Sequence, residues 1–545
     1  MKKGYTRLLI LFVTFLFSQQ LAQAQASGSS GSDTFTFTLL AIVVLIAFFV
    51  IIQVSDNLLR LEARKSGVKD DAGVSIFPGA GELFKPKTPG YANGSVVTLS
   101  KGFDIRLEGA AAGKVDENVK ALTFAMQPPN FRGLAPIPRV AVEVGNTVKA
   151  GDHLFFDKTN TELKYVAPVS GEVIAVNRGE RRAITEVVIL ADKEMKYREL
   201  PVFNLEKSTR EDLVNFLLDT GGWALIRQRP YDVSASYTDI PDNIFVSTFD
   251  TAPLAPDQNL VVQGKGEAFQ RGLDILAKLT KGKVYLGLNA NDSTPPSDVF
   301  TQAKGVEKRW FQGKHPSGNV GIQIHHIAPL TSKSCVWTLG VQEVITLGAL
   351  LTERRYNAER IVALTGAELN APKYVRTYTG ANIADLLKGN VAGDNVRIIS
   401  GDVLSGQKKD VNSFLNFFDD QITVLKEGDH YELFGWLLPD LASPSTSKAL
   451  PGWIFPDTTY KADTNTKGER RAFVMSGQYE DMLPMDIYPQ HLMKAILTND
   501  YEKMEGLGIY ELIEEDVALC EFACTSKQPL QQILRKGLDM MHEQG

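Results

Sequence analysis

The sequence predicts a multidomain protein of mixed α+β and α/β class. Three observations support this class. Short strand patterns with glycines at their turns recur between residues 144 and 173, strand and helix patterns alternate between residues 243 and 287, and apolar residues recur at helical spacing near the end of the chain. The length of 545 residues corresponds to about three or four domains at roughly 150 residues each.

Composition excludes several classes of protein. With 44% hydrophobic and 22% charged residues, the chain is not mostly disordered. The net charge of −6 argues against a nucleic-acid binder, whose affinity depends on basic surface. Only three cysteines are present, Cys335, Cys520 and Cys524. They are too few for a dense disulfide framework or for a four-cysteine cluster within this chain, and they fit a reducing compartment.

The first residues have the pattern of membrane targeting. Residues 1–26 resemble a signal peptide, with basic residues before a short apolar run and small residues at Ala22 and Ala24. Residues 34–55 carry no charge and would reach about 33 Å as a helix, which is enough to cross a bilayer. The sequence therefore predicts one transmembrane helix at 34–55, whether the first segment is cleaved or remains as an anchor.

The basic residues around the apolar segments predict the orientation. Residues 18–33 contain no Lys or Arg, whereas four basic residues follow the second segment: Arg60, Arg64, Lys65 and Lys69. The positive-inside rule then places the rest of the chain in the cytoplasm. We expect a single-pass protein of the cell inner membrane whose soluble body faces the cytoplasm. Residues 56–95, rich in turn-forming residues, are expected to be a linker.

Residues 96–200 are predicted to form a barrel-sandwich hybrid domain. The segments 144–155 and 166–173 repeat short strands around glycine turns, a pattern that resembles biotinyl and lipoyl carrier domains. In such carriers a modified lysine lies at the hairpin between the two halves. Lys158 and Lys164 occupy that hairpin, but the residues around them differ from the carrier motif, so a carrier function is an alternative rather than the main prediction.

Residues 201–356 are predicted to form a Rossmann-like α/β domain. Buried-strand patterns at 243–247 and 283–287 flank an amphipathic helix at 266–279. Gly264 and Gly266 precede this helix, but no third glycine completes the dinucleotide fingerprint, and no phosphate-binding loop motif is present. We therefore expect this scaffold without bound NAD.

Two polar motifs stand out in the α/β region. Arg227 and Arg229 lie on one predicted strand among aromatic residues, and His315, His325 and His326 cluster within a short segment. His325 and His326 are expected on a strand, where they point to opposite faces and cannot bind one metal ion together without a kink. We therefore expect polar side chains lining a cleft, and no metal site.

Two further regions complete the predicted organisation. Residues 357–406 have the order strand, strand, short helix, strand, which favours a β-grasp ligand-binding domain. Residues 407–545 are expected to be a mixed C-terminal domain that ends in helices at about 490–497, 510–514 and 531–541.

Several motifs, taken in order, carry a specific resemblance. They comprise Lys101–Leu107, Pro136, the hybrid-domain pattern, Ile226–Pro230, His315–Gly318, the β-grasp segment and Asp516–Cys524. Together they resemble the family of the A subunit of the sodium-translocating NADH:quinone reductase, which is related to the C subunit of the Rnf complex. The resemblance covers residues 96–545, and the signal-like and transmembrane extension departs from it.

The resemblance implies a role within a respiratory sodium pump that oxidises NADH, reduces quinone and exports Na⁺. The implied contribution of this chain is quinone binding and complex assembly at the cytoplasmic face. It implies no cofactor on this chain, quinone as substrate, and NADH, flavins and an iron–sulfur centre on partner subunits. An Rnf-type electron-transfer subunit is the alternative, although Cys520 and Cys524 alone are too few to hold a cluster.

A quinone site needs an apolar slot with hydrogen-bond donors for two carbonyl oxygens. From their motif positions and chemistry, we expect four residues to line such a site: Arg227, Arg229, His315 and Tyr378. No catalytic residue is predicted within this chain.

Overall fold

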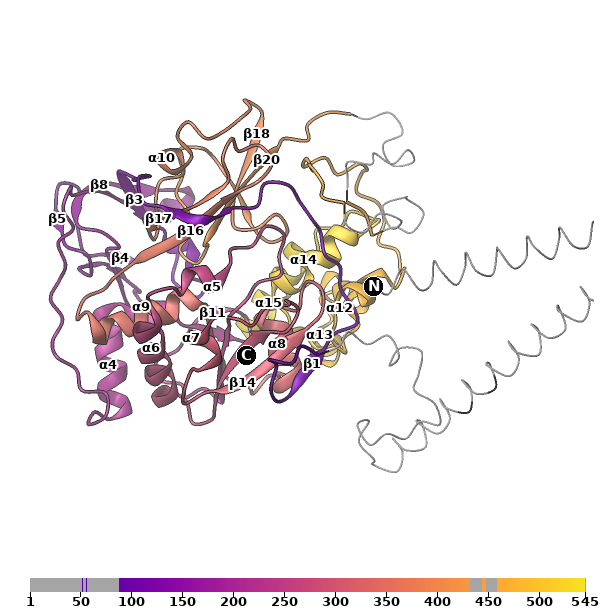
Figure 1. Ribbon diagram of the computed structural model, residues 1–545, viewed down its shortest axis with the longest axis horizontal. Coiled ribbons are helices and arrows are strands. Elements are labelled where there is room, and N and C mark those ends of the chain that lie inside the picture. The colour runs from indigo at the N-terminus through magenta and orange to yellow at the C-terminus, as the bar shows by residue number, and fades with distance from the viewer. Residues whose placement is uncertain (1–50, 52–54, 56–87, 432–443, 447–457, 545) are drawn as a thin grey trace, which may run out of the picture. The chain divides into compact units, whose positions relative to one another are not determined.

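The computed structural model describes residues 51, 55, 88–431, 444–446 and 458–544 (Figure 1). The signal-like segment 1–26, nearly all of the predicted transmembrane helix 34–55 and the predicted linker up to residue 87 lie outside these residues. None of the helices within the described ranges has both the length and the apolar character needed to cross a membrane. The chain divides into two compact units, Met1–Thr88 and Pro89–Gly545, and the architecture below is that of the second.

Two small sheets form the predicted barrel-sandwich hybrid. A four-stranded sheet has the order β3 (Thr123–Met126), β9 (Ile184–Ala191), β8 (Gly171–Arg178), β5 (Thr147–Val148), and a three-stranded sheet has the order β4 (Arg139–Val140), β6 (His153–Phe156), β7 (Lys164–Val166). The glycines that predicted this fold are required by its geometry. A Cβ atom at Gly171 would lie 1.9 Å from the carbonyl oxygen of Leu190, and Gly151 has a φ of 94°.

A seven-stranded sheet forms the centre of the α/β domain. Five strands are parallel, in the order β1 (Val96–Thr98), β14 (Glu307–Gln312), β13 (Val284–Asn289), β12 (Asn243–Ser247), β15 (Val336–Leu339). Two antiparallel strands, β10 (Arg227–Arg229) and β11 (Val233–Ser234), extend it beyond β15. The predicted order of strand, helix and strand is confirmed as β12, α6 (Gly266–Leu279) and β13.

Helices complete the α/β domain. Besides α6 they are α4 (Arg210–Thr220), α5 (Gln258–Val261), α7 (Asp298–Thr301), α8 (Val320–Ile327) and α9 (Val341–Thr352). Helices α6 and α9 cross at glycines, since a Cβ atom at Gly348 would lie 1.7 Å from the carbonyl oxygen of Ala268. The strand expected around His325 and His326 is wrong, because both lie on α8. The short apolar alternation before them fits a strand and a buried helix equally well.

The first two strands of the described body do not join the barrel-sandwich sheets. Strand β1 pairs in parallel with β14 in the α/β sheet, and β2 (Ala112–Asp116) pairs with β17 (Lys373–Tyr378). Residues 96–116 thus add edge strands to two other sheets, although the sequence predicts them in the first domain. An edge strand pairs on one side only, and its own residues do not reveal which sheet it will join. The sequence alone therefore could not assign β1 and β2 to these sheets.

The β-grasp region contains the predicted elements and continues past residue 406. Strand β16 (Glu359–Thr365), β17, α10 (Ile383–Leu387) and β18 (Val396–Ser400) follow the expected order. Two later strands, β19 (Gln407–Lys409) and β20 (Gln421–Lys426), complete a six-stranded sheet of order β19, β18, β20, β16, β17, β2. Strand β20 lies between β18 and β16, so the sheet requires residues beyond the predicted boundary.

Helices dominate the described part of the C-terminal region. They are α11 (Gln478–Met482), α12 (Pro489–Leu497), α13 (Tyr501–Gly506), α14 (Glu514–Ala523) and α15 (Leu530–Gln544). Their apolar faces form a core of their own, which contains Leu492, Ile496 and Leu538. Two side chains of α8 fasten this core to the α/β domain: Nδ1 of His325 lies 2.7 Å from a carboxylate oxygen of Glu511, and Nε2 of His326 lies 2.8 Å from the carbonyl oxygen of Pro484.

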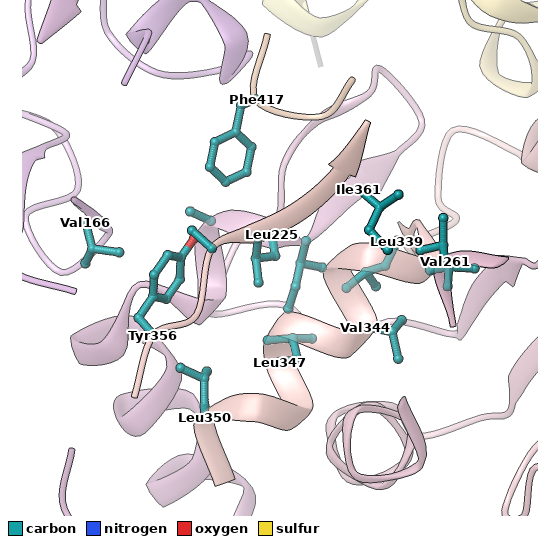
Figure 2. Close-up of a cluster of buried hydrophobic side chains, with 14 of the residues drawn as sticks. Val166, Leu225, Val261, Leu339, Val344, Leu347, Leu350, Tyr356, Ile361 and Phe417 are labelled. Atoms are coloured by element: carbon teal, nitrogen blue, oxygen red, sulfur yellow. The ribbon is translucent and has the colours of Figure 1, made fainter. Parts of the chain in front are cut away.

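A second, larger core joins the first three domains. Figure 2 shows Val166 of the barrel-sandwich hybrid, Leu347 of α9 and Ile361 of β16 among the side chains of one buried cluster. Tyr356 and Phe417 belong to the same cluster. Because these domains share apolar packing, they are held together by the same hydrophobic effect that stabilises each of them.

Candidate functional site

Two of the four predicted site residues lie near the edge formed by the carboxyl ends of the parallel strands: His315 follows β14, and Arg227 pairs with Thr338 near the end of β15. Arg229 instead pairs with Val336 at the start of β15. The chain passes from β12 through α6 to β13 on one side, while β15 pairs with β12 on the other side. The strand order therefore reverses between β12 and β15. In open α/β sheets, ligands bind outside the carboxyl ends of the strands at such a point.

His315 lies at this edge, in the loop between β14 and α8. Its side chain is 4% exposed, and Nδ1 lies 3.1 Å from Oγ1 of Thr251, which follows β12. The backbone N–H of His315 donates to a carboxylate oxygen of Asp104 at 2.9 Å. Burial lowers the pKa of His315 to about 4, so the ring is neutral at neutral pH. Nε2 is buried and has no hydrogen-bond partner among the residues described.

Arg227 has a partly exposed side chain at the site. Its side chain is 28% exposed, and it lies 5.0 Å from the ring centroid of Phe418, which precedes β20. A carboxylate oxygen of Asp232 is 3.6 Å away. The guanidinium thus presents hydrogen-bond donors beside an aromatic surface.

Arg229, two residues further along β10, is buried instead. Its side chain is 1% exposed, and its nitrogen atoms lie 3.2 Å from Glu515, 3.6 Å from Asp516 and 3.9 Å from Asp232. Glu515 also links Arg229 to the loop between β14 and α8 that contains His315. The backbone carbonyl oxygen of Glu515 accepts a hydrogen bond from the side chain of Asn319 in that loop at 3.2 Å. Arg229 therefore organises carboxylates behind the exposed edge and does not itself face solvent.

Asp232 is a buried carboxylate surrounded by arginines. Burial opposes its ionisation, but the arginines around it outweigh burial and lower its pKa. These arginines are Arg132, Arg227, Arg229 and Arg535. They come from the barrel-sandwich hybrid, the α/β domain and the C-terminal helices, so Asp232 lies where three domains meet.

Asp516 is a site residue whose role the sequence did not reveal. It lies in the first turn of α14, is fully buried, and accepts a hydrogen bond from the backbone N–H of Ile513 at 3.0 Å. Burial raises its pKa to about 7, although Arg229 opposes this shift. A Cβ atom at Gly321 of α8 would lie 2.4 Å from its carboxylate. The acidic run Glu514–Asp516 was the available signal for a helix start, but the sequence predicts a helix over about 510–514 instead of the observed α14.

Further carboxyl groups face the same edge. Desolvation by surrounding protein, together with the charges of Asp402, Asp420 and Glu515, raises the pKa of Asp250 to about 7. Burial likewise raises the pKa of Asp420 to about 6, although Gln258 donates a hydrogen bond to it at 2.9 Å. Carboxyl groups with such pKa values can take up and release protons near neutral pH. The edge therefore combines a cationic donor, a neutral imidazole and proton-exchanging acids.

Tyr378 lies apart from the other three predicted residues. It ends β17, where its ring centroid is 6.1 Å from that of Phe124, and its hydroxyl interacts with that of Tyr197. Across the described ranges, no hydrogen bond, ion pair or ring contact joins it to any of the other three. Phe124 and Tyr197 both belong to the barrel-sandwich hybrid, and Glu359 of β16 is the cross-strand partner of Tyr378.

The carrier-like hairpin packs against the α/β domain. Lys164 lies on β7, and its Nζ is 3.6 Å from a carboxylate oxygen of Asp219 in α4. A Cβ atom at Gly221 would lie 2.5 Å from the side chain of Val166, so this strand touches the end of α4 directly. Lys158, at the turn, is exposed. A carrier lysine has to travel between sites, whereas this hairpin is fixed in place by both contacts.

The two C-terminal cysteines pack inside the helical core. Cys520 and Cys524 are both buried, and the hydroxyl of Tyr479 lies 2.8 Å from Sγ of Cys524. Over the ranges that the structure describes, no group of three or more His, Cys, Asp or Glu side chains converges as metal ligands.

Comparison with protein families gives three matches in sequence order. They are the NqrA N-terminal barrel-sandwich hybrid domain at residues 97–192, the NqrA second alpha/beta domain at 208–356, and the NQRA C-terminal domain at 361–410. The order agrees with that of the barrel-sandwich hybrid, the α/β domain and the β-grasp region along the chain. The first match begins at the second residue of β1 and contains all of β2. These two strands nevertheless pair with β14 and β17, outside the barrel-sandwich sheets.

Relatives match the chain over their full length. The A subunit of the Na(+)-translocating NADH-quinone reductase of Hahella chejuensis is 36% identical, over 83% of this chain and 100% of its own. The corresponding proteins of Saccharophagus degradans and Shewanella frigidimarina are each 35% identical with the same coverage. Among solved structures, a chain of an NAD⁺-reducing [NiFe]-hydrogenase aligns with a TM-score of only 0.32 and 11% identity, over 61% of this chain and 63% of its own, which is too weak to bear on function.

Proposed function

Because this chain belongs to the family of the A subunit of the Na⁺-translocating NADH-quinone reductase, a component of a multisubunit oxidoreductase, we propose that it contributes to quinone binding and to assembly of that complex. The complex would oxidise NADH, reduce quinone and export Na⁺. This chain would act on the cytoplasmic face and hold no redox cofactor. NADH, the flavins and an iron–sulfur centre would belong to partner subunits.

The observation that carries the quinone proposal is the pairing of Arg227 with Phe418. A quinone has an apolar ring with carbonyl oxygens at its edge, so it needs an apolar surface beside a hydrogen-bond donor. The guanidinium of Arg227 lies 5.0 Å from the Phe418 ring centroid, and the side chain of Arg227 as a whole is 28% exposed. We place the quinone ring against Phe418, with one carbonyl oxygen accepting from Arg227.

The other predicted residues take different roles in this proposal. Arg229 is a positioning residue, since its buried guanidinium holds Glu515 and Asp516 behind the site. His315 is neutral and its Nε2 has no partner among the described residues, so it is the second candidate donor or acceptor for the quinone. Tyr378 would contact the same ligand only where the quinone extends toward the barrel-sandwich hybrid.

Quinone affinity in the assembled complex tests the proposal. Replacing Arg227→Gln removes a charged donor and should raise the apparent Kd for quinone about tenfold or more, because a hydrogen bond to a charged group contributes about 1.5–3 kcal/mol. Arg271→Gln is the matched control, since Arg271 is 49% exposed and pairs with Asp274 on the surface of α6. Unchanged quinone affinity in both Arg227→Gln and Phe418→Leu would refute this site.

Cofactor content tests the remaining functional alternatives. We expect the purified chain to show no flavin or iron–sulfur absorbance, whereas an Rnf-type electron-transfer subunit would show the latter. The peptide that contains Lys158 and Lys164 should have its unmodified mass. A mass increase corresponding to lipoyl or biotinyl would favour the carrier alternative.

Membrane attachment is tested separately. We propose that residues 34–55 tether the body to the inner membrane as a single span. The chain should then remain with the membrane fraction after a high-salt wash and be released by detergent. Release by salt alone would exclude a working span.

A further inference from the structure

Four aspartates gather around the proposed quinone site: Asp250 after β12, Asp402 after β18, and Asp419 and Asp420 before β20. The charges of Asp402 and Asp420 both act on Asp250, and the charge of Asp402 also acts on Asp419. Among the described residues none of the four forms an ion pair, and their hydrogen-bond donors are neutral groups: the side chains of Gln258, Ser400, Ser405 and Asn416 and the backbone N–H of Ala252. We call these four residues the aspartate cluster.

Positive charges act on the aspartate cluster only from further away. They are those of Arg227, Arg360 and Lys409. Arg360 is paired with Glu343, and Arg227 lies 3.6 Å from Asp232. Carboxylates crowded together without a cation among them repel each other, so the aspartate cluster keeps a proton near neutral pH.

Asp250 is the member of the aspartate cluster that solvent reaches best. It is exposed, whereas Asp402, Asp419 and Asp420 are partly buried. Desolvation by the protein on its other sides contributes most to raising its pKa to about 7. An acid that holds a proton near neutral pH and also meets water can give up that proton and take up another.

Thr251 connects Asp250 to His315. Its Oγ1 lies 3.1 Å from Nδ1 of His315 and accepts a hydrogen bond from the backbone N–H of Gly318 at 3.0 Å. The hydroxyl hydrogen of Thr251 is then free to point at Nδ1, which favours the form of the neutral ring that carries its hydrogen on Nε2. One carboxylate oxygen of Asp250 accepts from the backbone N–H of Ala252 at 2.8 Å, which holds the carboxyl group beside Thr251.

Nε2 of His315 is a buried polar atom without a partner among the described residues, on a side chain that is 4% exposed. Buried polar atoms in folded proteins almost always have a partner, so an unpartnered one points to a ligand. Asp402 acts on His315 and on Asp250, and Glu515 acts on Asp250 and on Arg227. The free ring atom, the aspartate cluster and the proposed quinone donor therefore belong to one neighbourhood.

We propose that Asp250 supplies a proton to the reduced quinone through the hydroxyl of Thr251 and the ring of His315. This inference rests on the proposed quinone site and adds the path of the proton to it. Asp250 and Thr251 are positioned to pass the proton, and His315 is the residue that touches the quinone oxygen.

The step balances in protons and electrons. Reduction of a quinone to a quinol adds two electrons and two protons, and each carbonyl oxygen becomes a hydroxyl. The electrons come from NADH through the partner subunits. The oxygen that faces His315 takes the proton of Nε2, Nδ1 takes the hydroxyl proton of Thr251, Thr251 takes the proton of Asp250, and Asp250 takes one from water. The other oxygen, held by Arg227, leaves as the anion and takes its proton from water on release.

The pH dependence of quinone reduction by the assembled complex tests the proposal. The donor has to be protonated, so kcat of the wild type should fall as the pH rises through about 7. Asp250→Asn carries no exchangeable acid proton and should lower kcat at least tenfold and remove this fall. A positioned acid contributes about 10²–10⁴-fold, which the rest of the aspartate cluster replaces only in part. The apparent Kd for quinone should not change.

Three further variants complete the test. Asp250→Glu should restore most of the rate, because it restores the acid. Thr251→Val removes the hydroxyl and should reproduce the loss of kcat, whereas Thr251→Ser should not. Asp410→Asn is the matched control, since Asp410 is exposed in the same region of the chain but lies outside the aspartate cluster.

The outcomes separate the proton path from the quinone site. Wild-type kcat and pH dependence in Asp250→Asn and in Thr251→Val, with quinone binding still weakened by Arg227→Gln, would overturn the proton path alone. Unchanged quinone affinity in Arg227→Gln and Phe418→Leu would overturn the quinone site and, with it, this inference. A loss of quinone affinity in Asp250→Asn as large as its loss of kcat would also overturn the inference, because Asp250 would then act in binding.

Discussion

Two clusters of charged side chains hold the domains of this chain against each other, and they differ mainly in their exposure to water. The hairpin cluster joins the barrel-sandwich hybrid to α4 through Arg198 and Asp219, whose side chains are 28% and 43% exposed. The junction cluster joins β10 to α14 through Arg229 and Asp516, whose side chains are 1% and 0% exposed.

Judged by distance alone, the hairpin cluster would contribute more to stability than the junction cluster. Arg198 and Asp219 approach to 2.7 Å, whereas Arg229 and Asp516 are 3.6 Å apart. Exposed pairs nevertheless contribute little, because water screens them. A buried pair costs free energy to desolvate, but removing one partner leaves an uncompensated charge in the interior. Burial, more than distance, therefore decides which cluster the fold depends on.

The largest expected loss of folding stability follows from substitution of Arg229. Replacing Arg229→Met leaves Asp232, Glu515 and Asp516 without their shared cation, which should lower the free energy of unfolding by about 3–5 kcal/mol. Urea denaturation followed by tryptophan fluorescence measures this loss. A loss no larger than that of Arg198→Met would contradict the comparison.

The second expected effect is a pH dependence of folding stability that arises from Asp516 in the junction cluster. Its pKa is raised to about 7 in the fold from 3.8, so the folded chain holds a proton that the unfolded chain releases. The stabilisation this provides is complete below about pH 4 and is lost as the pH rises through about 7. Asp516→Asn cannot ionise. The stability difference between wild type and this variant should therefore change across that range by at most about 4 kcal/mol. If the stability difference between wild type and Asp516→Asn did not change with pH, the raised pKa of Asp516 would be refuted.

His315 should show the opposite dependence. Its pKa is lowered by burial to about 4 from 6.5, so the unfolded chain binds a proton more readily than the folded chain. Stability is then lost as the pH falls from about 6.5 to about 4, by about 3 kcal/mol at most. His315→Gln should flatten this part of the stability profile. If wild type and variant decline equally in acid, the loss arises from other groups.

The smallest effect is expected at the hairpin cluster. Arg198→Met removes a short but exposed ion pair and should cost less than about 1 kcal/mol, with a dependence on salt concentration. The same urea titration used for Arg229→Met gives the comparison directly. A cost of several kcal/mol here would show that proximity, and not burial, governs both clusters.

Local patterns made part of this fold predictable. The β12–α6–β13 unit is recognisable because strand and helix periodicities each extend over several residues. The barrel-sandwich hybrid is recognisable because glycines such as Gly171 are required where strands approach closely. Both signals depend on residues near each other in the sequence.

What could not be predicted depends on residues far apart. Asp516 acquires its role from Arg229 and Gly321, and neither is near it in the sequence. Tyr378 was grouped with the arginines by residue type, although its neighbours are Phe124 and Tyr197. Side-chain chemistry can be read from the sequence, but the partners that set burial and pKa are supplied by the tertiary fold.

Strands β1 and β2 have a consequence for the order in which this chain can fold. Their partners, β14 and β17, are synthesised about 200 or more residues later, so both strands emerge from the ribosome long before anything can pair with them. Such long-range pairing raises contact order and slows folding. A nascent chain that has completed its barrel-sandwich sheets still carries two strands without partners, and unpaired strand edges of this kind favour aggregation.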